Sequence, residues 1–314
     1  MSRYIASRLG QALLVVWIAF TVTFLLLQAL PGDAILIKFQ NPELGLGPEQ
    51  IAALREAYGV DAPLWQQYLQ TLGQFLRGDF GYSVVGSVPV AHELLTNLPA
   101  TARLAGAGFT VALLLALTLA FLASLAPFAW LRSAIQALPS LFISVPVFWL
   151  GIMLIQIFSF RLKLISVINP GEIEGLILPV LTLAVPISAP LAQILIRNID
   201  EVSVQPFVAV ARAKGASHSW VLWKHVAGNA LLPTLTIAGL LFGELLAGAV
   251  ITETVFGLNG IGGLTERSVR FQDTSVIQAV VVFSAACFVA VNLTVDLLYP
   301  VFDPRLRKTK GAAA

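Results

Sequence analysis

The sequence has very little charge and almost no cysteine. Only 11% of its 314 residues are Asp, Glu, Lys or Arg, whereas soluble domains carry about a quarter. Because 57% of the residues are hydrophobic, the composition excludes intrinsic disorder and argues against a soluble globular protein. The net charge of +2 provides no basic field for nucleic acid. The single Cys287 excludes an internal disulfide framework and a cysteine cluster for zinc. An integral membrane protein remains.

The motifs of common enzyme sites are also missing. There is no GxxxxGK[ST] run to hold ATP phosphates and no HExxH pair for a metal. No serine lies in a GxSxG turn. None of the three histidines, His92, His218 and His225, is paired with carboxylates at ligand spacing. We therefore predict that the chain is not an enzyme and that it binds no metal and no cofactor of its own.

Long runs without charge are present instead. A helix needs about 20 apolar residues to cross the bilayer core, and no ten-residue alternating segments of a barrel are visible. The sequence therefore predicts an all-α membrane protein with six transmembrane helices. The expected spans are residues 9–30, 104–126, 134–160, 176–196, 231–253 and 275–299.

The basic residues predict the orientation. With both termini in the cytoplasm, the inner segments carry 11 Lys and Arg and three acids, and the outer segments carry eight basic residues and 11 acids. The inside then has a charge of +8 and the outside −3. Since cytoplasmic loops are enriched in Lys and Arg, we expect the N- and C-termini to be cytoplasmic.

Two connections are long enough to have their own structure. The outer segment 31–100 contains two helix-like stretches, Pro48–Tyr58 and Pro63–Leu76, which predict a folded cap or a packing element. In the cytoplasmic segment 197–230, Val208–Lys214 predicts a short helix that ends at Gly215.

In the same cytoplasmic segment, Ser217 is placed to cap a second helix over Ser219–Gly228. This second helix could dock on a cytosolic partner or lie on lipid.

Three acids fall inside the spans, which is costly and often functional. Glu244 is expected near the middle of the fifth span and Glu253 at its outer end, and Asp296 near the inner end of the sixth. Glu244 either touches a translocation path or is a buried hydrogen-bonding partner between helices.

Several motifs in order along the chain resemble one family. Residues 207–233 resemble the cytoplasmic loop of the permease subunits of binding-protein-dependent ABC importers, closest to the peptide/nickel group. Ala211 and Gly215 match the loop pattern of the family, whereas Ala209 stands where that pattern has Glu. The other matching segments are residues 30–33, 58–68, 77–81, 98–101, 253–262 and 292–307.

The resemblance implies the architecture and the partners. It implies a type I importer permease in the bacterial cytoplasmic (inner) membrane, with residues 1–314 forming one multi-pass domain. The implied partners are a second homologous permease, two ATP-binding subunits that hold ATP and Mg, and an extracytoplasmic solute-binding protein, with lipid around the spans and no nucleic acid. The implied cargo is a peptide or a related small solute; nickel or a metal–chelator complex is the alternative within the group.

The resemblance also implies site residues in three regions. Coupling to the ATPase would involve Ala209, Ala211, Arg212, Ala213, Lys214, Gly215 and His225. The translocation path or outer gate would involve Glu244, Glu253 and Phe256. Docking of the binding protein would involve Arg77, Asp79, Asn259, Gly260 and Gly262.

Two other classes of protein compete with this interpretation. An ion-coupled secondary transporter would use Glu244 as its ion site, but such transporters are built from inverted repeats, and the sequence shows no convincing repeat. An intramembrane enzyme would need a nucleophile–base or metal pair on facing spans, and no such pair is visible.

Overall fold

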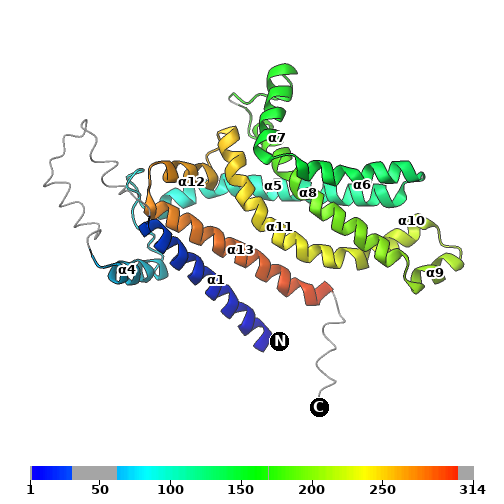
Figure 1. Cartoon of the computed structure of the whole chain (residues 1–314), viewed down its shortest axis with the longest axis horizontal. Coiled ribbons are helices and arrows are strands. Elements are labelled where there is room, and N and C mark those ends of the chain that lie inside the picture. The colour runs from blue at the N-terminus through cyan, green and yellow to red at the C-terminus, as the bar shows by residue number, and fades with distance from the viewer. Residues whose placement is uncertain (1, 30–61, 169, 303–314) are drawn as a thin grey trace, which may run out of the picture. The chain divides into compact units, whose positions relative to one another are not determined.

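The structure, a computed structural model, describes residues 2–29, 62–168 and 170–302, and within them the regular elements are helices joined by short loops. Figure 1 shows the helices in chain order. An isolated antiparallel bridge joins Tyr82 to Pro89. The elements are α1 (Ser2–Ala29), α4 (Leu64–Leu76), α5 (Val90–Leu125), α6 (Ala129–Ser144), α7 (Val147–Leu154), the π-helical η2 (Ile155–Arg161), α8 (Glu174–Ser203), α9 (Pro206–Ala213), α10 (His218–Val221), the π-helical η3 (Leu222–Val226), α11 (Ala227–Phe256), α12 (Ile261–Arg270) and α13 (Thr274–Phe302).

The predicted all-α membrane fold is confirmed. Among the described residues, five helices, α1, α5, α8, α11 and α13, contain stretches long and apolar enough to cross a membrane, and a sixth span results if a bent pair is counted as one. Several helices extend beyond the charge-free runs: α5 begins at Val90 and α8 continues to Ser203. A charge-free run marks only the part of a helix that suits the bilayer core, because the backbone hydrogen bonds continue into the polar flanks.

The third expected span, over 134–160, differs from the expectation. Two helical stretches, 129–144 and 147–161, meet there at an angle of 100°, and Figure 1 shows α6 and α7 pointing in different directions. Proline disfavours the helical conformation of the preceding residue, and Val145 before Pro146 is extended, with φ −96° and ψ 119°. The bend is therefore located at the Val145–Pro146 step.

The fold divides into two compact units. One comprises Met1–Thr101 and Gly257–Val289, and the other Ala102–Phe256 and Ala290–Ala314.

The expected helix Pro48–Tyr58 lies outside the described residues. The helix expected over Pro63–Leu76 is α4, which begins directly after Pro63; it is followed by Gly78, whose φ of +78° suits a chain leaving a helix.

The core of the first unit joins the start of α5 to α12 and α13. The apolar cluster consists of Val90, Leu94, Ile261, Leu264, Val276, Ala279 and Val280. The backbone N–H of Ile261 donates to the Thr101 hydroxyl over 2.8 Å.

Asp273, 1% exposed, fixes an adjoining loop in this unit. Its carboxylate accepts hydrogen bonds from the Ser83 hydroxyl at 2.7 Å and from the Val85 N–H at 3.0 Å. These contacts hold the loop before α5 against the turn that begins α13.

The core of the second unit is built around α8. Its buried residues include Ala184, Ile187, Leu191 and Ala192, which pack with α5 and α11. At Gly248 of α11, a Cβ would lie 3.2 Å from the Leu183 side chain, so glycine allows the two helices to approach closely. This packing positions the segment that follows α8.

Candidate functional site

Residues 204–226 form a compact turn between α8 and α11. α9 begins with Pro206 at its first position, where the missing N–H of proline is tolerated. It ends in a Schellman motif, in which Gly215 N–H bonds to Arg212 C=O and Ala216 N–H to Ala211 C=O. Gly215 adopts φ +87°, which is strained for residues with a side chain. The predicted stop at Gly215 is confirmed.

The second helix of this turn begins as predicted but does not end as expected. The Ser217 hydroxyl accepts from the backbone N–H of Trp220, so the predicted capping role is confirmed. No separate helix ends at Gly228; instead α10 passes through η3 directly into α11, giving one helical stretch from His218 to Phe256. A movement of the turn therefore acts directly on α11.

The inner face of the turn is firmly packed. Val208, Val221, Leu222 and Val226 are 0–2% exposed. They belong to a cluster with Phe121 of α5 and with Leu195 and Ile199 of α8. Burial of each such side chain stabilises the fold by about 1.5–3 kcal/mol, so the turn is anchored firmly on the helix ends beneath it.

His218 connects the turn to α5. Its Nε2 lies 3.0 Å from the Ser124 carbonyl oxygen and its Nδ1 3.3 Å from an Arg212 guanidinium nitrogen. A carbonyl only accepts and a guanidinium only donates, so the neutral ring with hydrogen on Nε2 satisfies both partners. Ser124 is in the last turn of α5, where carbonyl groups lack helical partners, and His218 supplies one.

Trp223 makes a second contact with α5. Its ring stacks on Phe121, with 4.2 Å between centroids. Neither His218 nor Trp223 belongs to the predicted set of coupling residues. Their partners on α5 are far away in the sequence, and for His218 the separation is 94 residues; no local signal reveals such pairs.

The outer face of the turn is exposed. Ala209, Arg212, Ala213, Lys214 and Gly215, all predicted coupling residues, are exposed on it. The exposed Phe207, Val210 and Trp220 add an apolar surface. Ala211 and His225 are half-buried, and the His225 ring packs against Trp220 at 5.1 Å. We call residues 207–220 the exposed turn. Its chemistry, apolar with two cationic side chains, suits contact with a protein.

An ion pair lies at the ends of two neighbouring helices. Arg132 near the start of α6 contacts Asp200 near the end of α8 over 2.7 Å, and both side chains are nearly half exposed. Exposed pairs of this kind contribute about 1 kcal/mol or less. The pair orients the two helix ends more than it stabilises them.

The residues predicted for the path do not share one environment. Glu244 is exposed on α11 in the single chain. Glu253 is buried, at 1% exposure. Phe256 packs near Gly151 of α7, where a Cβ would lie 3.3 Å from the ring. The structure therefore exposes Glu244, buries Glu253 and leaves Phe256 half-buried.

The residues predicted for docking also divide into two groups. Arg77, Asp79 and Asn259 are exposed, whereas Gly260 and Gly262 are buried. Gly260 directly precedes α12 and is its N-cap residue. The two glycines thus serve the packing of α12, and only the three polar residues offer surface.

Within the described part of the chain, no group of three His, Cys, Asp or Glu side chains is placed to hold a metal ion.

Family models match almost the whole chain. Residues 81–308 match the model described as "Binding-protein-dependent transport system inner membrane component", and residues 1–105 match the corresponding N-terminal model. Relatives cover nearly the full length. The glutathione transport system permease protein GsiC of Escherichia coli K12 is 32% identical over 311 residues, 98% of this chain and 99% of that protein. A putative peptide transport system permease protein of Brucella abortus is 34% identical over 316 residues, with the same coverage.

Solved structures agree on the fold. A subunit of the MetNI methionine ABC transporter in an inward-facing conformation has a TM-score of 0.57 at 16% identity, covering 67% of this chain and 96% of that one. A chain of an amino acid ABC transporter has a TM-score of 0.50 at 19% identity, covering 68% of this chain and 94% of that one.

This chain belongs to the family of binding-protein-dependent transport system inner membrane components. It is a multi-pass inner-membrane permease of an ABC importer, and its relatives place it in the peptide group.

Proposed function

We propose that the chain imports a peptide or a related solute such as glutathione, using ATP that partner subunits hydrolyse. The observation that carries the proposal is the exposed turn: a rigid body packed on α5 and α8, continuous with α11, whose outer face presents apolar and cationic side chains. The names of the relatives support the choice of cargo, since they are described as glutathione and peptide transport permeases.

The proposed assembly has two ATP-binding subunits, a second homologous permease and an extracytoplasmic solute-binding protein. ATP and Mg bind to the partner subunits. Both termini and the exposed turn lie in the cytoplasm, as the distribution of Lys and Arg favours. The family description, which names dependence on a binding protein, supports the extracytoplasmic partner.

The proposed mechanism is a rigid-body switch. When the ATP-binding subunits close, they displace the exposed turn, and the turn displaces the ends of the spanning helices, which exchange inward- and outward-open states. His218 and Trp223 pass the displacement to α5, and the continuous stretch from His218 to Phe256 passes it to α11. Arg212 and Lys214 are the residues proposed to pair with acids of the ATPase.

The proposed translocation path runs past Glu244. An exposed carboxylate within a membrane span is costly in lipid, so this face of α11 requires a polar neighbour, which the second permease and the water-filled path provide. The buried Glu253 and the half-buried Phe256 are proposed as parts of a gate near the C-terminal end of α11. Arg77, Asp79 and Asn259 are the exposed residues proposed to meet the binding protein.

Replacing His218 by alanine tests the proposed coupling. The change removes the contact to the Ser124 carbonyl and leaves Arg212 without its acceptor. One hydrogen bond contributes roughly 1 kcal/mol, so we expect solute uptake per ATP hydrolysed to fall about two- to tenfold. Uptake and phosphate release are measured together in proteoliposomes that contain the whole importer.

Two variants serve as controls for this experiment. His218→Gln keeps a donor and an acceptor at the end of the side chain and should restore much of the ratio. Ser133→Ala removes an exposed hydroxyl of α6, outside the exposed turn, and should leave the ratio unchanged. If His218→Ala lowers uptake and hydrolysis in equal proportion, His218 only stabilises the fold and the coupling role is wrong.

A further inference from the structure

α4 has an unusual composition for a helix outside the six spans. Residues 64–76 contain no charged side chain, and four of the 13 are glutamine. With about 3.6 residues per turn, the apolar residues fall on one side of the helix and Gln66, Gln70 and Gln74 on the other. The apolar side consists of Leu64, Trp65, Tyr68, Leu69, Leu72, Phe75 and Leu76.

Part of the apolar side packs on α1. The Tyr68 ring meets Phe24 edge to face, with 5.4 Å between centroids, and Phe75 meets Phe20 at 5.1 Å. The Tyr68 hydroxyl lies 2.8 Å from that of Thr21. Because the Thr21 hydroxyl already donates to the Trp17 carbonyl, Tyr68 is the donor in this pair. Both hydroxyls are thus satisfied without water.

These contacts set the depth of α4 along α1. They involve Phe20, Thr21 and Phe24, and Gln28 donates to Gln67 over 2.8 Å. All four positions lie in the C-terminal half of the span Ala6–Ala29. A helix that packs beside a membrane span at these positions is at the level of the bilayer, not beyond it.

The rest of the apolar side remains uncovered. Leu64 and Leu69 are 58% exposed, Trp65 is 68% exposed and Leu76 is 80% exposed. On α1, Val22, Leu25 and Leu26 are likewise exposed. Since α1 is one of the spans, its exposed apolar face is suited to lipid.

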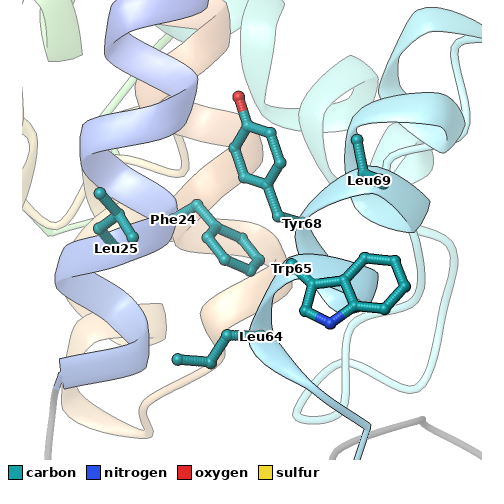
Figure 2. Close-up of a pocket in the computed structure, with 6 residues that line it drawn as sticks. All are labelled: Phe24, Leu25, Leu64, Trp65, Tyr68 and Leu69. Atoms are coloured by element: carbon teal, nitrogen blue, oxygen red, sulfur yellow. The ribbon is translucent and has the colours of Figure 1, made fainter.

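A pocket connects the two exposed faces. It has a volume of about 380 Å³ and an apolar lining formed by Phe24, Leu25, Leu64, Trp65, Tyr68 and Leu69. Figure 2 shows Phe24 and Leu25 from α1 and the other four from α4 around it. Sites for small polar molecules have a few placed polar groups that orient the ligand. Here the one hydroxyl, that of Tyr68, is already bonded to Thr21.

We propose that α4 lies in the bilayer at its interface, with its uncovered side toward lipid, and that the pocket binds the acyl chain of a membrane lipid. An acyl chain matches the lining because it needs no polar partner. Trp65 lines the pocket and is exposed. A tryptophan at this place fits the level of the lipid headgroups, where tryptophan is enriched. In the proposed orientation of the permease, which belongs to the proposed function, this interface is that of the outer leaflet. The contact with lipid does not depend on that orientation.

Spin labels at two adjacent residues test the position of α4. Cys287 is the single cysteine, so a Cys287→Ala chain accepts one label after Leu69→Cys or Gln70→Cys. Both residues are exposed, but they lie on different sides of α4. In the whole importer in lipid nanodiscs, we expect the label at 69 to collide with oxygen, which dissolves in the bilayer, and the label at 70 to collide with a water-soluble nickel chelate.

The other outcomes overturn the position in lipid. If the nickel chelate reaches both labels equally, α4 lies in water. If neither reagent reaches the label at 69, a protein covers this face, and the occupant is the second permease or the binding protein. Neither outcome depends on transport, so this test fails or succeeds independently of the proposed function.

A photoreactive lipid tests the pocket itself. A phosphatidylethanolamine with a diazirine on its acyl chain is incorporated into the nanodisc, irradiated, and its adducts are located by mass spectrometry. We expect adducts within residues 64–69, and most of them lost in Leu25→Trp, which fills the pocket. Leu14→Trp, at another exposed position of α1, is the matched control and should leave the yield unchanged. An equal yield in Leu25→Trp would contradict binding in the pocket.

Discussion

Replacing Gly215 by valine is expected to reduce ATP-driven uptake by about tenfold or more while the chain still inserts and assembles. Gly215 has φ +87° and closes the Schellman motif at the end of α9. A left-handed conformation costs residues with a side chain roughly 1–2 kcal/mol, and a β-branched residue is a clear outlier there. The valine variant would distort the exposed turn that transmits the movement of the ATPase.

The control for this variant distinguishes backbone strain from a steric clash of the new side chain. A Cβ at Gly215 would meet no atom within 4 Å, so size alone does not exclude a side chain. Asparagine tolerates the left-handed conformation far better than valine, and Gly215→Asn should retain most of the uptake. The assay is uptake of labelled solute, normalised to the amount of assembled importer. Normal uptake in the valine variant would contradict the role of the turn.

Replacing Asp273 by alanine is expected to give the largest loss of stability. The buried carboxylate accepts from Ser83 and Val85, and its removal leaves both donors without this acceptor. Each lost bond of this kind costs about 1–3 kcal/mol, so we expect a total loss of roughly 2–5 kcal/mol. The measurement is the thermal unfolding temperature of the purified protein in detergent, together with its amount in the membrane.

A surface acid of the same unit provides the comparison. Glu266 pairs with Arg270 within α12 and is over one-third exposed, so Glu266→Ala should cost no more than about 0.5 kcal/mol. Asp273→Asn keeps one acceptor oxygen and should fall between the two. Equal unfolding temperatures for the Asp273→Ala and Glu266→Ala variants would show that Asp273 does not hold the loop before α5.

Local signals in the sequence predicted the elements well. Charge-free runs indicated the membrane spans, because charges are excluded from the bilayer core. Pro206, Gly215 and Ser217 indicated the start, the stop and the cap in the exposed turn, because each acts on its own backbone.

The sequence alone does not reveal features that depend on tertiary packing, such as which proline breaks a helix. Pro146 lies at the break between α6 and α7, whereas Pro99 and Pro139 remain inside helices. In the interior of a helix proline removes one hydrogen bond, but neighbouring helices in a membrane protein can compensate. The sequence alone does not tell which proline is compensated.

Residues that act across long separations were missed for the same reason. His218 contacts a residue 94 positions away, and Asp273 one that is 190 positions away. Likewise, Glu244 and Glu253 are both acids of α11, and only the packing around them exposes the first and buries the second.

The energy source of uptake tests the central claim most directly. The importer is reconstituted with both permeases, the ATP-binding subunits and the binding protein, and uptake of a labelled peptide or of glutathione is followed. We predict that uptake requires hydrolysable ATP on the side of the exposed turn, persists when the proton gradient is dissipated, and remains dependent on ATP in Glu244→Gln. Accumulation by this chain alone, driven by a proton gradient and abolished by Glu244→Gln, would contradict the account and identify an ion-coupled transporter.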